Sequence, residues 1–352
     1  MALSKVRSKK SNILRDKSPL YRGDFCIFLR DKVSCVYSIM KPHTPFFSLI
    51  IPHINEGYYL DAMLDSIAIH VEFSDYEIIL VDDGSDHISD LDFIDFHPLR
   101  ERIQIFHEKH LGSAGARNMG AKYAKGKYLF FLDAHMYFME DSLKILYAVL
   151  TQQPKLDILQ PMIWDYATKR TLWKVYKIRD WLLDSGWDES NQGSSLLVDT
   201  PCSSAAATII KSRTFQKLGG FHPFFEKWGA EDLELPMRAW LSGYRAKLFT
   251  GTKIIHRFKE SFTNTEIKSE CVCYNKILFS YTCFSNRHAL AMIQKSLQHH
   301  YWNTFDVQEE RVRENTVFQK WKRKVQKSFI HDDTWYFKKF VSYYPKFVEL
   351  YH

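Results

Sequence analysis

The sequence predicts an α/β fold, Rossmann-like, in which a mostly parallel sheet carries helices on both faces. Short apolar segments alternate with segments of helical spacing through the first half of the chain, and this alternation is typical of such sheets. Polar clusters follow three of the apolar segments, at the edge where parallel sheets bind ligands. The second half is less regular and ends in residues 287–352, which we expect to be helical, aromatic and basic.

The elements follow in order along the chain. The apolar segments expected to form strands are 47–52, 76–81, 103–106 and 128–132, followed by 205–210 and 253–256. The segments expected to form helices are one carrying Leu60, Met63, Leu64 and Ile67, one at 112–124, one carrying Leu143, Leu146, Tyr147 and Leu150, and one at 231–242. Pro236 must lie in the first turns of the last helix. Residues 161–200 are rich in Trp, Asp, Ser and Gly, which favours a long functional loop.

Composition restricts the class of protein. With 352 residues, the chain can bury a large core without disulfides. Its six cysteines show no zinc-binding spacing, and we expect reduced thiols in a cytoplasmic protein. We expect no transmembrane segment, because the sequence has no apolar run of about 18 residues. The basic start of the chain also lacks the apolar stretch of a secretory signal.

Charge is unevenly distributed along the chain. Residues 1–41 carry a net charge of +7 and residues 287–352 a net charge of +5. Because the whole chain carries +7, residues 42–286 carry −5. An acidic centre that holds an anionic ligand needs a metal cation in its site. The basic ends suit solvated surface, an acidic partner or peripheral contact with a membrane, and without a recognition motif we expect no nucleic acid partner.

The most informative pair is Asp133 and His135, which follow a predicted buried strand. Residues two apart on an extended segment point the same way, so these two side chains can share one ligand. A carboxylate oxygen with an imidazole nitrogen fits Mn²⁺ better than Ca²⁺ or Mg²⁺. The alternative is a hydrogen-bonded Asp–His pair at a strand end.

Three further acids lie at the ends of predicted elements. Asp83 closes a strand, where its carboxylate can accept from the imide N–H of uracil, or simply form a turn. Glu231 and Asp232 open a helix, either as a sugar-binding carboxylate beside a general base or as acids that stabilise the helix N-terminus. The residues before them favour the first interpretation, because they predict a shaped loop whose Trp228 offers an aromatic surface to a sugar.

Two residues are less specific on their own. A histidine on an apolar strand, such as His256, is more often a core residue than a ligand. Arg117, in a predicted helix, would usually lie on the surface.

In this combination the segments resemble GT-A fold glycosyltransferases. The resemblance is strongest to the catalytic domain of polypeptide N-acetylgalactosaminyltransferases and to inverting, family 2-like galactosyl- and chondroitin-type transferases. It rests on residues 48–56, 77–85, 112–118, 131–135, 228–234 and 256–258, and it covers about residues 45–265. We therefore expect a basic N-terminal extension at 1–44, a GT-A catalytic domain at 45–286 and a helical tail at 287–352.

The resemblance also implies roles for single residues. With Trp228, which is expected in the site because of the neighbouring Glu231, the expected donor-binding set is Pro52, Asn55, Glu56, Asp83, Arg117, Asp133, Trp228, Glu231 and Lys259. The resemblance implies a metal-binding set in which Asp133 and His135 form a DxH motif that His256 completes. Within the donor set, Asp83 aligns with the acid that binds uracil, Glu231 with the acid that holds sugar hydroxyls, and Lys259 with a phosphate-binding arginine whose bidentate fork lysine lacks. Asp232 and Glu231 are the expected catalytic residues.

The sequence departs from the polypeptide transferases at several positions. Pro52 replaces a threonine and His110 an arginine. Those enzymes carry Glu-Asn where this chain has Glu231-Asp232, and Glu-Asp is typical of inverting relatives. The sequence shows neither their lectin domain nor their membrane anchor, which favours a soluble enzyme of bacterial or viral type.

These observations predict a metal-dependent enzyme. It would use Mn²⁺, with Mg²⁺ as the alternative, to move a hexose or N-acetylhexosamine from a UDP-sugar to a peptide side chain or a glycan. We expect inversion with Asp232 as base. The alternatives are a retaining transferase of the polypeptide type and a non-catalytic sugar-nucleotide-binding module. Residues 52–57 lack the Gly-rich basic loop that a nucleotidyltransferase would need.

Overall fold

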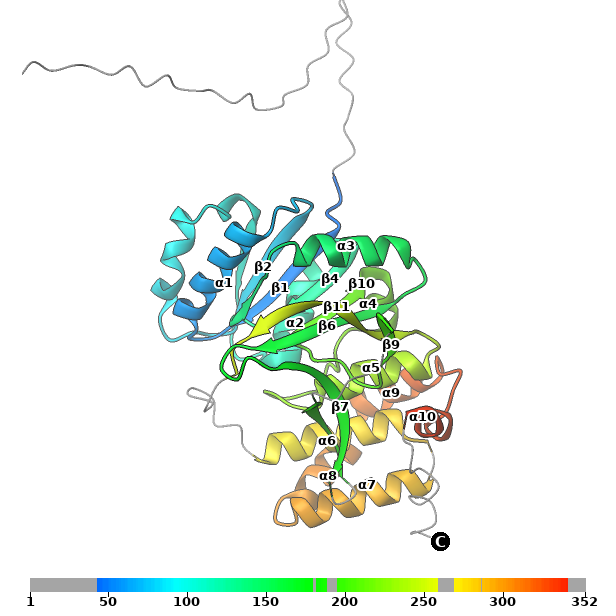
Figure 1. Ribbon diagram of the computed structural model, residues 1–352. Helices are drawn as coiled ribbons and strands as arrows, with labels where there is room; N and C mark the ends of the chain where they lie inside the picture. Colours follow the sequence, from blue (N-terminus) through cyan, green and yellow to red (C-terminus); the bar gives the residue numbers. More distant parts are fainter. Residues whose placement is uncertain (1–42, 180–181, 189–194, 259–268, 286, 341–352) are drawn as a thin grey trace, which may run out of the picture. The chain divides into compact units, whose positions relative to one another are not determined.

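Figure 1 shows the computed structural model of the protein, which describes residues 43–179, 182–188, 195–258, 269–285 and 287–340. The chain divides into two units, Met1–His43 and Thr44–His352, and all the described helices and strands lie in the second. The predicted N-terminal extension and Lys259 lie outside the described residues. Within these ranges, no helix has both the length and the apolar character needed to cross a membrane.

A mixed sheet forms the centre of this unit, with strands in the order β3-β2-β1-β4-β10-β6-β11-β5 (Figure 1). The strands are β1 (Phe47–His53), β2 (Tyr76–Asp82), β3 (Ile103–His107), β4 (Tyr128–Leu132), β5 (Met136–Tyr137), β6 (Ile158–Asp165), β10 (Ala207–Lys211) and β11 (Ala246–His256). β3, β2, β1 and β4 pair in parallel, β10 is antiparallel to both neighbours, and β6 and β11 are parallel. The predicted α/β fold is confirmed, with continuous parallel pairing in the N-terminal half.

Helices cover both faces of the sheet. Successive residues of a strand point to opposite sides, so each strand contributes side chains to both buried layers. Ile50 of β1 belongs to one buried cluster, and its neighbours Leu49 and Ile51 belong to another. The cluster around Leu49 includes α1 (Gly57–His70) and α3 (Ser142–Gln152). The cluster around Ile50 includes α2 (Gly112–Tyr123), α4 (Ser212–Leu218) and α5 (Glu231–Leu241). The four apolar residues that predicted the first helix are all buried in α1. Two 3₁₀ segments, η1 (Ile88–Phe96) and η2 (Arg100–Arg102), connect β2 to β3.

The prediction of a long loop over residues 161–200 is wrong. β6 continues to Asp165, and β7 (Thr171–Arg179) and β8 (Leu182–Asp188) form an antiparallel hairpin after it. A short strand, β9 (Leu197–Asp199), pairs with β11. The β-branched and aromatic residues of 171–179 favour extended structure, and this preference outweighs the Ser and Gly content on which the loop prediction rested.

The described residues after the sheet are helical, which confirms the expectation for residues 287–340, and one further helix that was not predicted precedes them. They form α6 (Ser269–Cys283), α7 (Arg287–His300), α8 (Phe305–Glu314), α9 (Thr316–Gln326) and α10 (Asp333–Phe340). Phe279, Phe305, Phe318 and Tyr336 share the buried cluster that contains α5. Because this burial removes apolar surface from water, these helices help to stabilise the sheet domain on which they pack.

Candidate active site

Three side chains converge at one edge of the sheet. Asp133 follows β4, His135 lies two residues further on, and His256 ends β11. The Arg257 N–H donates to the His135 carbonyl, which holds the end of β11 beside β5. Asp133 Oδ2 lies 3.8 Å from His135 Nε2 and 3.7 Å from His256 Nε2. One ligand atom from each residue lies within 4.8 Å of the other two, an arrangement that could hold a metal ion.

Glu56 orients His135. Its Oε2 lies 2.6 Å from His135 Nδ1, and because an ionised carboxylate can only accept, Nδ1 carries the proton. The lone pair of Nε2 is then available to a cation, as in metal-binding histidines whose second nitrogen donates to a carboxylate. Sequence spacing did not predict this contact. The available signal was that Glu56 and His135 follow neighbouring strands, β1 and β4.

Arg117 of α2 is buried, so its expected place on the helix surface is wrong. Its Nη2 lies 2.5 Å from Asp133 Oδ1, and its Nη1 donates to Ser113 Oγ. Burial alone would raise the pKa of Asp133, but Arg117, His135 and His256 outweigh it and hold this pKa well below its usual range. Asp133 is therefore ionised, as a metal-binding carboxylate must be.

Glu231 begins α5 after two residues with left-handed backbone, Gly229 and Ala230. Its Oε2 accepts from the Gly229 N–H at 2.8 Å, whereas its buried Oε1 has no hydrogen-bond partner among the described residues. Burial raises the pKa of Glu231, although nearby Arg117 opposes the shift. An unpaired buried acceptor is costly, and the hydroxyl of a ligand would satisfy it.

Asp232 turns toward a different loop from Glu231. Its Oδ1 accepts from the Ala205 N–H at 2.7 Å, and its carbonyl accepts from the Ser203 N–H at 3.0 Å. Pro236 lies in the second turn of α5, four residues after Asp232, and has no N–H to donate back to that carbonyl. The proline therefore leaves the Asp232 carbonyl available to the 203–205 segment.

The remaining predicted residues lie around this centre. The Trp228 side chain is 46% exposed in the loop before α5. Asp83 accepts from the Leu111 and Gly112 N–H groups at 2.5 and 2.8 Å, at the start of α2, and burial raises its pKa. The Asn55 side chain braces its loop by bonding to Asp86.

Pro52 pairs with Val81 in the β1–β2 ladder and is half-buried. It lies near the end of β1, and Asn55 and Glu56 follow in the segment that connects β1 to α1.

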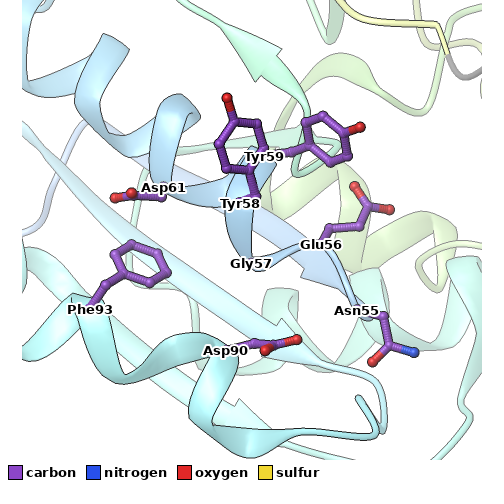
Figure 2. A pocket seen from close by; sticks show the side chains of 8 residues that line it. All are labelled: Asn55, Glu56, Gly57, Tyr58, Tyr59, Asp61, Asp90 and Phe93. Carbon is purple, nitrogen blue, oxygen red and sulfur yellow. The ribbon is translucent and has the colours of Figure 1, made fainter.

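A pocket of about 400 Å³ lies at the N-terminus of α1, beside Glu56 (Figure 2). Its lining includes Tyr58, Tyr59 and Phe93 together with the carboxylates of Glu56, Asp61 and Asp90. Three carboxylates repel a diphosphate, so this pocket does not suit the phosphates of a nucleotide.

A second group of potential metal ligands contains Asp61, Asp65 and His97. The Leu99 N–H donates to His97 Nδ1 at 3.1 Å. His97 Nε2 therefore carries a proton, and it lies 3.4 Å from Asp65 Oδ1. A protonated nitrogen cannot bind a metal, so this group is a histidine–carboxylate pair.

Comparison with known proteins defines the class of this domain. Residues 48–218 match the glycosyl transferase family 2 model, and residues 202–262 match the model named N-terminal domain of galactosyltransferase. The structure of GalNAc-T7 with UDP, GalNAc and Mn²⁺ matches with a TM-score of 0.67 and 16% identity, over 87% of this chain and 58% of that one. The described chain therefore has the GT-A fold, and it carries a glycosyltransferase family 2 domain.

Sequence relatives make the relationship more specific. The inactive polypeptide N-acetylgalactosaminyltransferase-like protein 5 of Macaca fascicularis is 27% identical over 68% of this chain and 58% of its own length. The putative polypeptide N-acetylgalactosaminyltransferase 13 of Drosophila melanogaster is 29% identical over 52% of this chain and 36% of its own length. The chain is thus homologous to polypeptide N-acetylgalactosaminyltransferases, as its motifs predicted, and it matches less than two thirds of the length of these relatives.

Proposed function

We propose that this protein transfers a hexose or N-acetylhexosamine from a UDP-sugar to an acceptor, with the help of a divalent cation. The observation that carries the proposal is the convergence of Asp133, His135 and His256 in the same region as Glu231, whose Oε1 is buried without a partner among the described residues. Arg117 connects the two parts, because it pairs with Asp133 and also opposes the rise that burial causes in the pKa of Glu231.

The side chains of Asp133, His135 and His256 suit a metal ion. Asp133 is ionised, and His135 directs its unprotonated Nε2 toward Asp133, so oxygen and nitrogen ligands are ready for Mn²⁺, with Mg²⁺ as the alternative. When bound, the cation would act as a Lewis acid toward the diphosphate. The GalNAc-T7 structure, which shares this fold, is a structure with UDP, GalNAc and Mn²⁺, and this supports the same type of donor and metal here.

We assign the base to Asp232. In an inverting transfer, the acceptor oxygen attacks the anomeric carbon, the bond from that carbon to the diphosphate oxygen breaks, and UDP leaves with the electron pair. The acceptor proton passes to the base. The carboxylates of Glu231 and Asp232 bond to different backbone amides, those of Gly229 and Ala205, which supports separate roles for the sugar and the acceptor.

Retention of configuration is the alternative, supported by homology to the polypeptide transferases. That homology also supports a peptide side chain as acceptor, beside a glycan. A non-catalytic sugar-nucleotide-binding module is a second candidate function, because one relative is named inactive. The ionised Asp133 and the intact acid pair favour an enzyme over this candidate.

We also propose that the protein is cytoplasmic. The described cysteines, Cys202, Cys271, Cys273 and Cys283, are free thiols, which supports the reducing cytoplasm. Isolation of a disulfide-linked form from cells would argue against it.

Hydrolysis of the donor tests the main proposal without knowledge of the acceptor. We expect wild-type protein in Mn²⁺ to release UDP from at least one of UDP-GlcNAc, UDP-GalNAc and UDP-glucose. Asp133→Asn should fail to do so, while Lys217→Ala, which changes an exposed side chain of α4, serves as control. Binding of a UDP-sugar without any turnover, with or without acceptors, would favour the non-catalytic module.

The role of Asp83 requires a separate comparison. If it accepts from the uracil imide N–H, calorimetry in Mn²⁺ should show tighter binding of UDP than of GDP, whose base differs in shape, or of CDP, whose ring nitrogen at that position carries no hydrogen. Equal affinities would remove Asp83 from this role.

A further inference from the structure

The loop that carries Trp228 is held from below by one buried side chain, Asn275 of α6. Asn275 Oδ1 accepts from the Glu226 N–H at 2.8 Å. Its Nδ2 lies 2.8 Å from the Glu226 carbonyl, 3.2 Å from the Trp228 carbonyl and 3.1 Å from the Gly229 carbonyl. The side chain is fully buried, so water cannot replace these bonds.

The same loop is fixed from the opposite side by α2. The Ser113 N–H donates to the Lys227 carbonyl at 2.6 Å. Gly112 lies so close that a Cβ on it would stand 2.8 Å from the backbone of Lys227. The loop therefore runs between the start of α2 and the middle of α6.

The loop needs such support because its backbone is strained. Lys227 and Ala230 have φ values of 49° and 75°, and Gly229 between them has a φ of 114°. Left-handed conformations of non-glycine residues persist only where the surroundings impose them. In turn, the Gly229 N–H donates to Glu231 Oε2, so the conformation of the loop also sets the direction of the Glu231 carboxylate.

We propose that Asn275 is a positioning residue of the sugar subsite: it holds the 226–229 backbone in the form that presents Trp228 and Glu231 to the donor sugar. This inference rests on the proposed function. It also makes α6 a working part of the site, although the sequence motifs end before that helix begins.

Asparagine is suited to this position because one amide group supplies an acceptor for one N–H and two donors for three carbonyls. In Asn275→Asp, an oxygen would face those three carbonyls and repel them. In Asn275→Ala, the three carbonyls would lose their shared donor without any added charge. The Glu226–Arg311 ion pair, at 2.7 Å, and the Ser113 contact would remain, so we expect both variants to fold.

Two measurements on Asn275→Asp and Asn275→Ala test the inference. Hydrogen exchange should be faster at the amides of residues 226–229 in each variant than in the wild type. Calorimetry in Mn²⁺ should show about a tenfold or larger loss of affinity for the UDP-sugar that the wild type prefers, because a loop that is no longer held must be ordered when the sugar binds. Affinity for UDP, which makes no sugar contacts, should stay the same.

Gln326→Glu is the matched control. The Gln326 amide also donates to two backbone carbonyls, those of Tyr281 and Thr282, but away from this loop. The Gln326→Glu variant should leave both the hydrogen exchange at residues 226–229 and the affinity for the UDP-sugar unchanged. Unchanged exchange in the Asn275 variants, or equal losses for UDP and the UDP-sugar, would overturn the positioning role. A wild type that binds no UDP-sugar would instead overturn the proposed function itself.

Discussion

Asp232 makes contacts that keep its carboxylate in place whether or not it is charged. Oδ1 accepts from the Ala205 N–H, and the main-chain carbonyl accepts from the Ser203 N–H. Asparagine retains an Oδ1 that can accept from Ala205, so Asp232→Asn removes the base while preserving the loop. This makes the substitution a test of chemistry more than of folding.

We expect Asp232→Asn to lower kcat by about 10²–10⁴-fold, the usual contribution of a general base, with UDP affinity nearly unchanged. Steady-state kinetics and calorimetry measure the two quantities. If Asp232 only supports the helix N-terminus, activity should barely change and stability should fall by a few tenths of a kcal/mol. The anomeric coupling constant of the product in proton NMR supplies an independent check, since an α-linked product excludes a direct displacement with Asp232 as base.

Glu231 illustrates a conflict between stability and function in a single residue. Burial raises its folded-state pKa above the ordinary value of 4.5. Its contribution to stability is therefore fully present below pH 4.5 and is lost as pH rises through the raised pKa. Glu231→Gln removes this loss, because the amide carries no charge to bury.

We expect Glu231→Gln to gain stability relative to the wild type at about pH 8 and to lose that advantage at about pH 4. Urea denaturation at both values measures the difference. The same variant should lower kcat/KM by about 10- to 100-fold, since a hydrogen bond to a charged group contributes about 1.5–3 kcal/mol. A stability difference that does not depend on pH would show that burial of the charge at Glu231 is not its cause.

At the level of elements, Pro236 decides how α5 meets the 203–205 segment. A proline inside a helix normally costs about 3 kcal/mol relative to alanine. Pro236 has no N–H to donate to the Asp232 carbonyl, but that carbonyl already accepts from the Ser203 N–H. The proline is therefore compatible with its surroundings and also limits the freedom of the unfolded chain.

We expect Pro236→Ala to change the free energy of unfolding by less than about 1 kcal/mol and to accelerate hydrogen exchange at the Ser203 amide, whose acceptor the new N–H would share. Urea denaturation and exchange measure the two effects. Asn275→Ala is a suitable comparison, because Asn275 contacts the 226–229 loop and not the 203–205 segment. It should leave hydrogen exchange at the Ser203 amide unchanged. If Pro236→Ala stabilised the protein by about 3 kcal/mol and left hydrogen exchange at Ser203 unchanged, this role of Pro236 would be contradicted.

The elements also show which features were predictable from sequence. Strong periodicity located α1, and the polar residues after β2 and β4 indicated the functional edge of the sheet. Such signals are local, whereas the contacts that complete the site join distant segments. Glu56 reaches His135 across neighbouring strands, Arg117 is buried by its ion pair with Asp133, and Asn275 meets a loop nearly fifty residues earlier.

Considered as a whole, the molecule concentrates negative charge where an anion is expected to bind. Residues 42–286 carry a net charge of −5, and the candidate site includes Glu56, Asp83, Asp133 and Glu231. Arg117 is already paired with Asp133. Such a field repels a nucleoside diphosphate unless a cation accompanies it.

Binding of UDP and Mn²⁺ should therefore be strongly coupled. We expect UDP to bind at least about tenfold more tightly in Mn²⁺ than in EDTA, and Mn²⁺ affinity to rise by the same factor when UDP is present, because linkage is reciprocal. Turnover should stop in EDTA and return when Mn²⁺ is added. His256→Ala should abolish the coupling, whereas His97→Ala, in the group with Asp61 and Asp65, should preserve it. Calorimetry in both orders of addition measures the coupling, and equal UDP affinity with and without the metal would exclude Asp133, His135 and His256 as the place where cation and diphosphate meet.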